Sequence, residues 1–211
     1  MPSARCVLLD ALGTLVELEP PWTHLAAALG VEADEGMVRA FEAEMRYYRE
    51  HSDEGRDADS LADLRRRCAA ILSRELGREI PVETMMGAIR FRPFPDAPPA
   101  LSELRGVGLT LVCVSNWDCS LPQVLERCGI GRLLDGVVTS AEAGARKPDR
   151  AIFERGLELA GCGAADALYV GDTPAEDLDG AGSAGIRAML IDRDGGGDID
   201  SLLSIRHHLD L

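Results

Sequence analysis

Short apolar runs, each followed at once by a polar residue or a glycine, are the feature of this sequence that most restricts its fold. A continuous apolar run of this length is typical of a strand that is buried on both faces of a parallel sheet. Such a strand needs helices on both sides of the sheet to cover it. The runs comprise residues 6–9, 109–114, 167–170 and 186–191 and, more weakly, Val137 with Val138.

Helical patterns lie between the later runs. Residues 121–128 place apolar side chains at helical spacing and end at Gly129, and residues 152–160 repeat this pattern before Gly161. Strands that alternate with helices in this way predict an α/β fold with a doubly wound, Rossmann-like parallel sheet at its core.

Residues 17–92 contain no strand-like run and instead carry four helical patterns. The chain has 211 residues, which suits one large domain or one domain with an insert. We therefore expect an α/β core domain over residues 1–16 and 93–211 and an all-helical inserted domain over residues 17–92. Ser60 is the expected N-cap of the third inserted helix, and the proline-rich residues 92–99 are expected to form the return linker.

The net charge of the chain limits the classes of molecule that it can bind. The chain has 22 basic and 36 acidic residues and a net charge of −14, which disfavours nucleic acid and anionic lipid. We expect no nucleic-acid partner and no membrane, since no apolar stretch approaches the roughly 20 residues of a membrane span. The six cysteines include no C-x-x-C pair, and the start of the chain has no signal-peptide pattern. We therefore expect reduced, buried thiols in a cytoplasmic protein.

Polar side chains stand where the predicted strands end. Asp10 follows the first run, Ser115 follows the second, Lys147 lies in the loop after the weak run, and Asp172 with Asp177 follows the next. In open α/β sheets, sites lie outside these carboxyl ends. The 22 basic residues are 21 arginines and the single lysine, Lys147, and a compact ammonium acts as a point charge that a planar guanidinium does not replace. The set suits covalent catalysis by an aspartate on an anionic substrate.

Four motifs in this order resemble those of the haloacid dehalogenase-like hydrolase superfamily, and the inserted domain is similar to the helical cap that follows the first motif in that family. The resemblance covers essentially the whole chain. The motifs are Asp10-Ala11-Leu12-Gly13-Thr14-Leu15, Ser115-Asn116-Trp117-Asp118, Lys147-Pro148-Asp149 and Gly171-Asp172-Thr173-Pro174-Ala175-Glu176-Asp177.

The resemblance implies a role for each motif residue in catalysis. Asp10 is the implied covalent nucleophile, Thr14 is implied to orient it, Ser115 and Asn116 to bind a phosphoryl or carboxylate group, and Lys147 to neutralise charge. Each has a structural alternative: Asp10 and Thr14 as turn residues, Ser115 and Asn116 as helix caps, and Lys147 as a solvated surface charge.

The resemblance also implies a magnesium site. Asp10, the backbone carbonyl of Leu12, and Asp172 are the implied ligands, with Asp177 supporting them. Mg²⁺ prefers a few carboxylates together with waters and a substrate phosphate, which this set supplies. The alternative for Asp172 and Asp177 is a cap on the following helix.

Leu12 departs from the pattern of the family's phosphatases, which have a proton-transferring aspartate at this position. The favoured hypothesis is a Mg²⁺-dependent phosphate hydrolase that prefers good leaving groups, acting on a small anionic substrate. A metal-independent dehalogenase for 2-haloacids is the second hypothesis, with Arg39 binding the substrate. A non-catalytic binding protein on the same scaffold is the third. The candidates for substrate specificity are Trp22, Arg39 and Tyr47 with Tyr48. The run Arg65-Arg66-Arg67 is expected to form a solvated face. The sequence does not indicate the oligomeric state.

Overall fold

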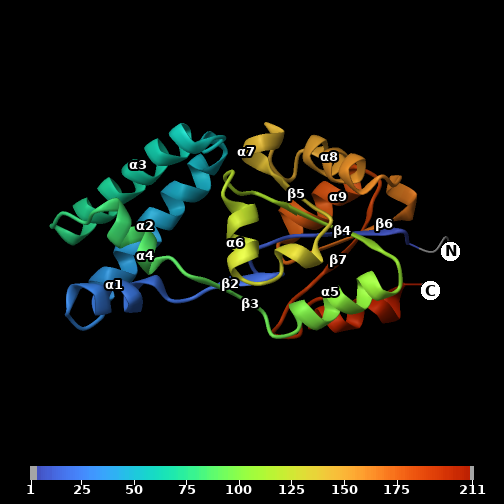
Figure 1. The fold of residues 1–211 in the computed structure, drawn as a ribbon, viewed down its shortest axis with the longest axis horizontal. Coiled ribbons are helices and arrows are strands. Elements are labelled where there is room, and N and C mark those ends of the chain that lie inside the picture. Colours follow the sequence, from blue (N-terminus) through green and yellow to red (C-terminus); the bar gives the residue numbers. More distant parts are fainter. Residues whose placement is uncertain (1–3, 210–211) are drawn as a thin grey trace.

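Five parallel strands form the central sheet of the computed structural model, which describes residues 4–209 (Figure 1). Their order is β5-β4-β1-β6-β7, and in β1 Cys6 lies opposite Thr110 on one side and Ala167 on the other. The predicted parallel α/β core is therefore confirmed. The strands are β1 (Cys6–Leu9), β4 (Thr110–Ser115), β5 (Gly136–Thr139), β6 (Ala167–Gly171) and β7 (Arg187–Leu190).

Helices cover both faces of this sheet, which explains why β1 is apolar at every position. Side chains alternate along a strand, so Val7 and Leu9 enter one core cluster and Cys6 and Leu8 enter the other. Figure 1 shows the two helical layers. One layer holds α5 (Ala97–Gly106), α6 (Leu121–Arg127) and the 3-10 helix η5 (Leu202–His208), and the other holds α8 (Arg150–Ala160) and α9 (Asp179–Ser183).

Four helices of the inserted domain pack around an apolar core of their own (Figure 1). The N-cap of the third helix differs from the prediction, because it is Asp57 and not Ser60. Ser60 completes a capping box by accepting a hydrogen bond from the Asp57 amide. The helices are α1 (Pro21–Leu29), α2 (Glu35–His51), α3 (Ala58–Leu76) and α4 (Val82–Ala88), with the 3-10 turn η1 (Ser52–Glu54) between α2 and α3.

Two short strands connect the inserted helices to the core. β2 (Val16–Leu18) pairs with antiparallel β3 (Phe91–Pro93), so the expectation that residues 17–92 are purely helical is wrong at both ends. The predicted return linker is shorter than residues 92–99, because α5 begins at Ala97 and accepts Pro98 and Pro99 in its first turn, where no amide donor is required. The domain boundaries at residues 16 and 92 stay a prediction.

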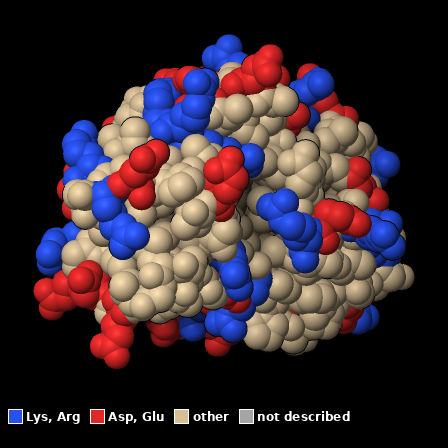
Figure 2. Space-filling view, turned by 60° about the vertical axis from the view of Figure 1, so that its left-hand side comes forward, with Lys and Arg blue, Asp and Glu red and all other residues tan. Residues whose placement is uncertain are grey.

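Shorter elements complete the core. They are the 3-10 turns η2 (Gly131–Leu133) and η3 (Ala164–Asp166), the helix α7 (Ser140–Ala143) and the π-helical turn η4 (Pro174–Leu178). None of the helices within residues 4–209 combines the length and apolar character needed to cross a bilayer. Basic and acidic side chains are interspersed over the face seen in Figure 2.

One cysteine pair contradicts the expectation that all thiols are reduced. Cys6 and Cys162 form a disulfide although 156 positions separate them in the chain. β1 lies beside α8, whose C-terminal end brings Cys162 to a Cα–Cα distance of 6.7 Å from Cys6. The cysteines therefore no longer support the expectation of a reducing compartment. The other cysteines remain thiols, namely Cys68, Cys113, Cys119 and Cys128.

Candidate active site

The polar residues at the carboxyl ends of the strands meet at one edge of the sheet, beneath the inserted helices. Asp10 follows β1, Ser115 ends β4, Asp172 follows β6, and Lys147 reaches this edge from the loop between α7 and α8. All four side chains line one cavity of about 800 Å³, which continues between the core and helices α2, α3 and α4. The structure therefore brings together these four of the residues that the motifs singled out.

Lys147 is the centre of a buried polar cluster. Its ammonium group, on a residue only 3% exposed, donates hydrogen bonds to Asp10 Oδ1 at 2.6 Å and to Asp177 Oδ1 at 2.6 Å. A third hydrogen bond, to the hydroxyl of Tyr169 at 3.0 Å, uses its remaining donor. The Tyr169 hydroxyl in turn donates to Asp177 Oδ1 at 2.7 Å. Lys147 is thus no solvated surface charge, and its three hydrogen bonds hold the ammonium in a fixed position next to Asp10.

Burial and charge have opposite effects on the ionisable groups of this cluster. Burial raises the pKa of Asp10 to about 6, the positive charge of Lys147 opposes this rise, and the negative charges of Asp177 and Asp172 add to it. For Lys147 burial alone favours the neutral amine, yet Asp10 and Asp177 outweigh it and raise the pKa above its ordinary value. Burial, followed by the charge of Asp177, also raises the pKa of Asp172.

Three carboxylates form a candidate metal centre. Asp10, Asp172 and Asp177 each offer one oxygen, and these oxygens all lie within 4.8 Å of one another. Hard oxygen donors of this kind match Mg²⁺. Gly13 fits the same arrangement, because a Cβ at this position would lie 2.0 Å from Asp172 Oδ2, and its φ of +84° is one that glycine adopts without strain. The residues present therefore fit a bound divalent cation.

Asp177 accepts more hydrogen bonds from neighbouring residues than the other two carboxylates do. It is fully buried, its Oδ1 accepts hydrogen bonds from Lys147 and Tyr169, and its Oδ2 accepts one from the Thr173 amide at 2.9 Å. Asp172 by contrast is exposed toward the cavity. This geometry favours Asp172 as the ligand and Asp177 as the residue that holds Lys147.

Asn116 contacts the backbone of Lys147. Its Oδ1 accepts from the Lys147 amide at 2.7 Å, and its Nδ2 donates to the Lys147 carbonyl at 3.1 Å and to Glu176 at 2.9 Å. The side chain therefore positions the lysine loop, and Asn116 also lines the cavity. The predicted contact of Ser115 and Asn116 with a phosphoryl or carboxylate group stays a prediction. Ser115 is buried and lines the cavity.

Thr14 is buried behind the motif-one turn. Its hydroxyl has no hydrogen-bond partner among the residues that the structure describes, and the residue does not line the cavity. Its carbonyl accepts a hydrogen bond from Arg193 at 2.7 Å. Thr14 therefore contributes to the turn through its backbone, and the predicted orienting role of the side chain has no hydrogen bond to support it.

Arg39 is outside the site, and the expectation that it contacts a substrate is wrong. Its side chain is 69% exposed and pairs with Glu35 at 3.5 Å on the solvent side of α2. Phe41 faces the cavity two residues later, and two residues along a helix rotate the side chain by roughly 200°. The solvated-face expectation for the arginine run also needs correction, because Arg65 lines the cavity. The arginines that line it are Arg49, Arg65, Arg127 and Arg146.

Hydrogen bonds join the inserted domain to the core beside the cavity. Tyr48 lines the cavity, as expected for a specificity candidate, and its hydroxyl donates to Asp118 at 2.8 Å; Tyr47 and Trp22 do not line it. The turn after α2 adds hydrogen bonds, among them the one from the Cys119 amide to the Gly55 carbonyl at 2.8 Å. No sequence pattern indicated these contacts, because the partners lie far apart in the chain.

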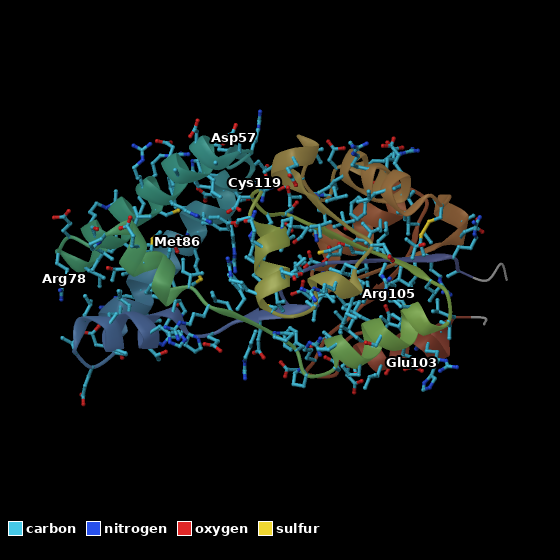
Figure 3. The ribbon with its side chains drawn as sticks, viewed as in Figure 1. Asp57, Arg78, Met86, Glu103, Arg105 and Cys119 are labelled. Carbon is cyan, nitrogen blue, oxygen red and sulfur yellow. A yellow bond between two sulfur atoms is a disulfide. The ribbon has the colours of Figure 1, made fainter. Side chains whose placement is uncertain are left out.

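The part of the cavity under the inserted domain is mainly apolar. Its lining includes Met86, which Figure 3 shows on the inserted domain. Glu44, Arg49 and Arg65 are the charged residues of the inserted domain that line the same cavity. The apolar lining residues include Phe41, Met45, Leu64, Met85, Met86, Ile89, Phe91 and Trp117.

Comparisons with known proteins show the family of this chain. Residues 4–185 match the family model described as haloacid dehalogenase-like hydrolase. The chain is 32% identical over 180 residues to glyceraldehyde 3-phosphate phosphatase of Methanothermobacter thermautotrophicus, a match covering 78% of this chain and 75% of that protein. It is 33% identical over 120 residues to phosphoserine phosphatase of Thermus thermophilus, which covers 56% of this chain and 48% of that protein.

A solved structure is similar over nearly its entire length. The 2-haloacid dehalogenase from Pseudomonas syringae superposes with a TM-score of 0.67 at 23% identity, covering 97% of both chains. At this identity the likeness concerns the fold alone.

Proposed function

Since the chain belongs to the haloacid dehalogenase-like hydrolase family, we propose that it is a Mg²⁺-dependent phosphate hydrolase in which Asp10 is the covalent nucleophile. The observation that carries this proposal is the Asp10 carboxylate, 2.6 Å from the buried Lys147 ammonium in the wall of the cavity. The names of the two phosphatase relatives support a phosphate substrate. The substrate is a small anion, since its phosphoryl group has to reach this floor.

Asp10 attacks phosphorus with its second carboxylate oxygen. Within residues 4–209 only Lys147 donates a side-chain hydrogen bond to this carboxylate, and it does so at Oδ1. An O–P bond forms and the bond from phosphorus to the leaving oxygen breaks. Water then attacks phosphorus, which releases inorganic phosphate and restores the carboxylate. In both steps Lys147 stabilises negative charge next to the Asp10 carboxylate.

A divalent cation held by Asp10, Asp172 and the Leu12 carbonyl supplies charge neutralisation for the phosphoryl oxygens when bound. Asp177 keeps Lys147 in place beside it. Ser115 offers a hydroxyl from the end of β4 to a phosphoryl oxygen.

Leu12 restricts the leaving group. Its side chain, half-buried at the cavity, transfers no proton, and general acid catalysis is typically worth roughly 10²–10⁴-fold. We therefore expect acyl and aryl phosphates to be hydrolysed faster than alkyl phosphates.

Leu12 also favours a halide, which leaves without a proton, so a metal-independent dehalogenase remains the second candidate. The exposed position of Arg39 takes away the substrate anchor on which that hypothesis relied. A non-catalytic binding protein is the third candidate, and the geometry of Asp10 and Lys147 counts against it.

The test is a screen of aryl, acyl and alkyl phosphates and 2-chloropropionate, with and without Mg²⁺. We expect Mg²⁺-dependent release of phosphate that Asp10→Asn abolishes and that Asp200→Asn, a matched change at an exposed carboxylate, leaves intact. Halide release without Mg²⁺ would support the dehalogenase instead. No turnover of any compound would support the binding protein.

A further inference from the structure

Glu44 is a buried carboxyl group in the wall of the cavity, on the side of the inserted domain. It is 3% exposed and lines the cavity from α2. Phe41, Met45 and Tyr48 line the same cavity at i−3, i+1 and i+4 from it, so they form one stripe along the helix. A carboxyl group on an otherwise apolar and aromatic stripe is the exception that requires a reason.

Within residues 4–209, no ion pair compensates the charge of Glu44. Among the described residues, no lysine, arginine or histidine forms an ion pair with it, although the arginines of this domain pair with several exposed carboxylates. Burial raises the pKa of Glu44 to about 7, and a hydrogen bond with the thiol of Cys68 opposes this rise. A thiol is a weak donor, so the carboxyl oxygens keep capacity to accept a stronger hydrogen bond.

The surroundings of Glu44 give no structural need for a carboxyl group. Phe41, Leu64 and Cys68 belong to the apolar core of the inserted domain, and an apolar side chain of similar volume at such a position is often neutral or stabilising. What distinguishes Glu44 from these neighbours is that a polar group presented to the cavity is available to a molecule inside it. Few, well-placed polar groups in an apolar lining fix the orientation of a ligand.

We propose that Glu44 is a specificity-determining residue that accepts a hydrogen bond from a hydroxyl or amine on an otherwise apolar leaving group. The inference rests on the proposed function, because the phosphoryl group is taken to lie at Asp10. The substrate class is then an aryl phosphate monoester whose phenol leaving group is largely apolar and carries one further hydrogen-bond donor. An analogue without the donor leaves Glu44 buried and unpaired, which a site of this kind rejects.

The test compares three aryl phosphates that differ in one group: cresyl phosphate, hydroxymethylphenyl phosphate and aminomethylphenyl phosphate, each as the para and the meta isomer. The protein is the full chain with Mg²⁺, and kcat/KM is measured for wild type, Glu44→Leu and Glu44→Gln. Glu42→Gln is the matched control, since Glu42 lies on the same helix and is exposed. Thermal unfolding of each variant checks that it is folded.

We expect the wild type to prefer a donor-bearing ester over its cresyl counterpart by about 10-fold or more. Glu44→Leu removes this preference, so that its kcat/KM for a donor-bearing ester falls to that for the cresyl ester. Glu44→Gln keeps the preference for the hydroxymethyl ester, because its amide oxygen still accepts, and Glu42→Gln changes nothing. Equal preference in wild type and Glu44→Leu would overturn the inference, and so would a parallel loss for all esters, which marks a structural role.

A binding experiment separates this inference from the proposed function. Hydroxymethylbenzyl and methylbenzyl phosphonates carry a carbon in place of the bridging oxygen, and their affinities are measured by calorimetry for wild type and Glu44→Leu. Tighter binding of the hydroxymethyl compound, lost in Glu44→Leu, supports the role of Glu44 even if no ester is hydrolysed. Equal affinities in both proteins would overturn it while leaving the phosphatase assay to decide the proposed function.

Discussion

Replacing Lys147 by methionine removes the cation that lies between Asp10 and Asp177 and leaves two carboxylates buried side by side. Both accept a hydrogen bond of 2.6 Å from its ammonium. Breaking a buried ion pair by removing one partner costs about 3–5 kcal/mol. For a chain of this size each kcal/mol lowers Tm by about 2–4 °C, so we expect a fall in Tm of roughly 6–20 °C.

Urea unfolding measures this loss, and its pH dependence identifies the cause. The charge of Lys147 lowers the pKa of Asp10, which is about 6 in the wild type; without it that pKa rises further. Protonation then relieves the repulsion, so the deficit of Lys147→Met is smaller at pH 5 than at pH 8.

Arg150→Met is the matched control, because Arg150 pairs with Glu154 on the surface and such pairs contribute at most about 1 kcal/mol. A deficit for Lys147→Met no larger than that of the control, or equal at both pH values, would refute the reasoning.

Further changes test other parts of the site. Burial raises the pKa of Glu44 from 4.5 to about 7, so the folded protein keeps a proton that the unfolded chain releases. Wild-type stability should therefore fall by about 3 kcal/mol more than that of Glu44→Gln as pH rises from 4.5 to above 7, measured by urea unfolding; parallel pH profiles would contradict this. Leu12→Asp supplies the missing acid and should raise kcat for glycerol phosphate about 10–10²-fold, with no change for nitrophenyl phosphate; an unaltered ratio would count against the role given to Leu12. Chelation by EDTA should abolish phosphate release, and Asp172→Asn should raise the Mg²⁺ concentration needed for half-maximal activity about 10-fold or more; activity indifferent to EDTA would exclude the metal centre.

Local patterns in the sequence were sufficient for the core and for the place of the motifs. The runs before Asp10, Ser115 and Asp172 become β1, β4 and β6, because a strand buried on both faces has to be apolar throughout. The solitary lysine pointed to a requirement for one compact cation, and Lys147 lies against Asp10.

Features that depend on pairs of distant residues did not follow from the sequence. The Cys6–Cys162 disulfide arises from the packing of α8 against β1. The hydrogen bond from Tyr48 to Asp118 arises from the fold of the inserted domain. Arg39 was misplaced because its distance along the chain from the first motif says nothing about the side of α2 on which it lies. Glu44 had a signal, since it interrupts the apolar stripe of Phe41, Met45 and Tyr48.

Covalent catalysis by Asp10 is tested most directly by trapping its intermediate. The enzyme is mixed with an aryl phosphate and Mg²⁺, quenched during turnover, reduced with borohydride, which converts an aspartyl phosphate into homoserine, and digested for mass spectrometry. The account predicts homoserine at position 10 and at no other aspartate. Phosphate release with Asp10 unmodified at every quench time, or a trapped intermediate on another residue, would contradict it.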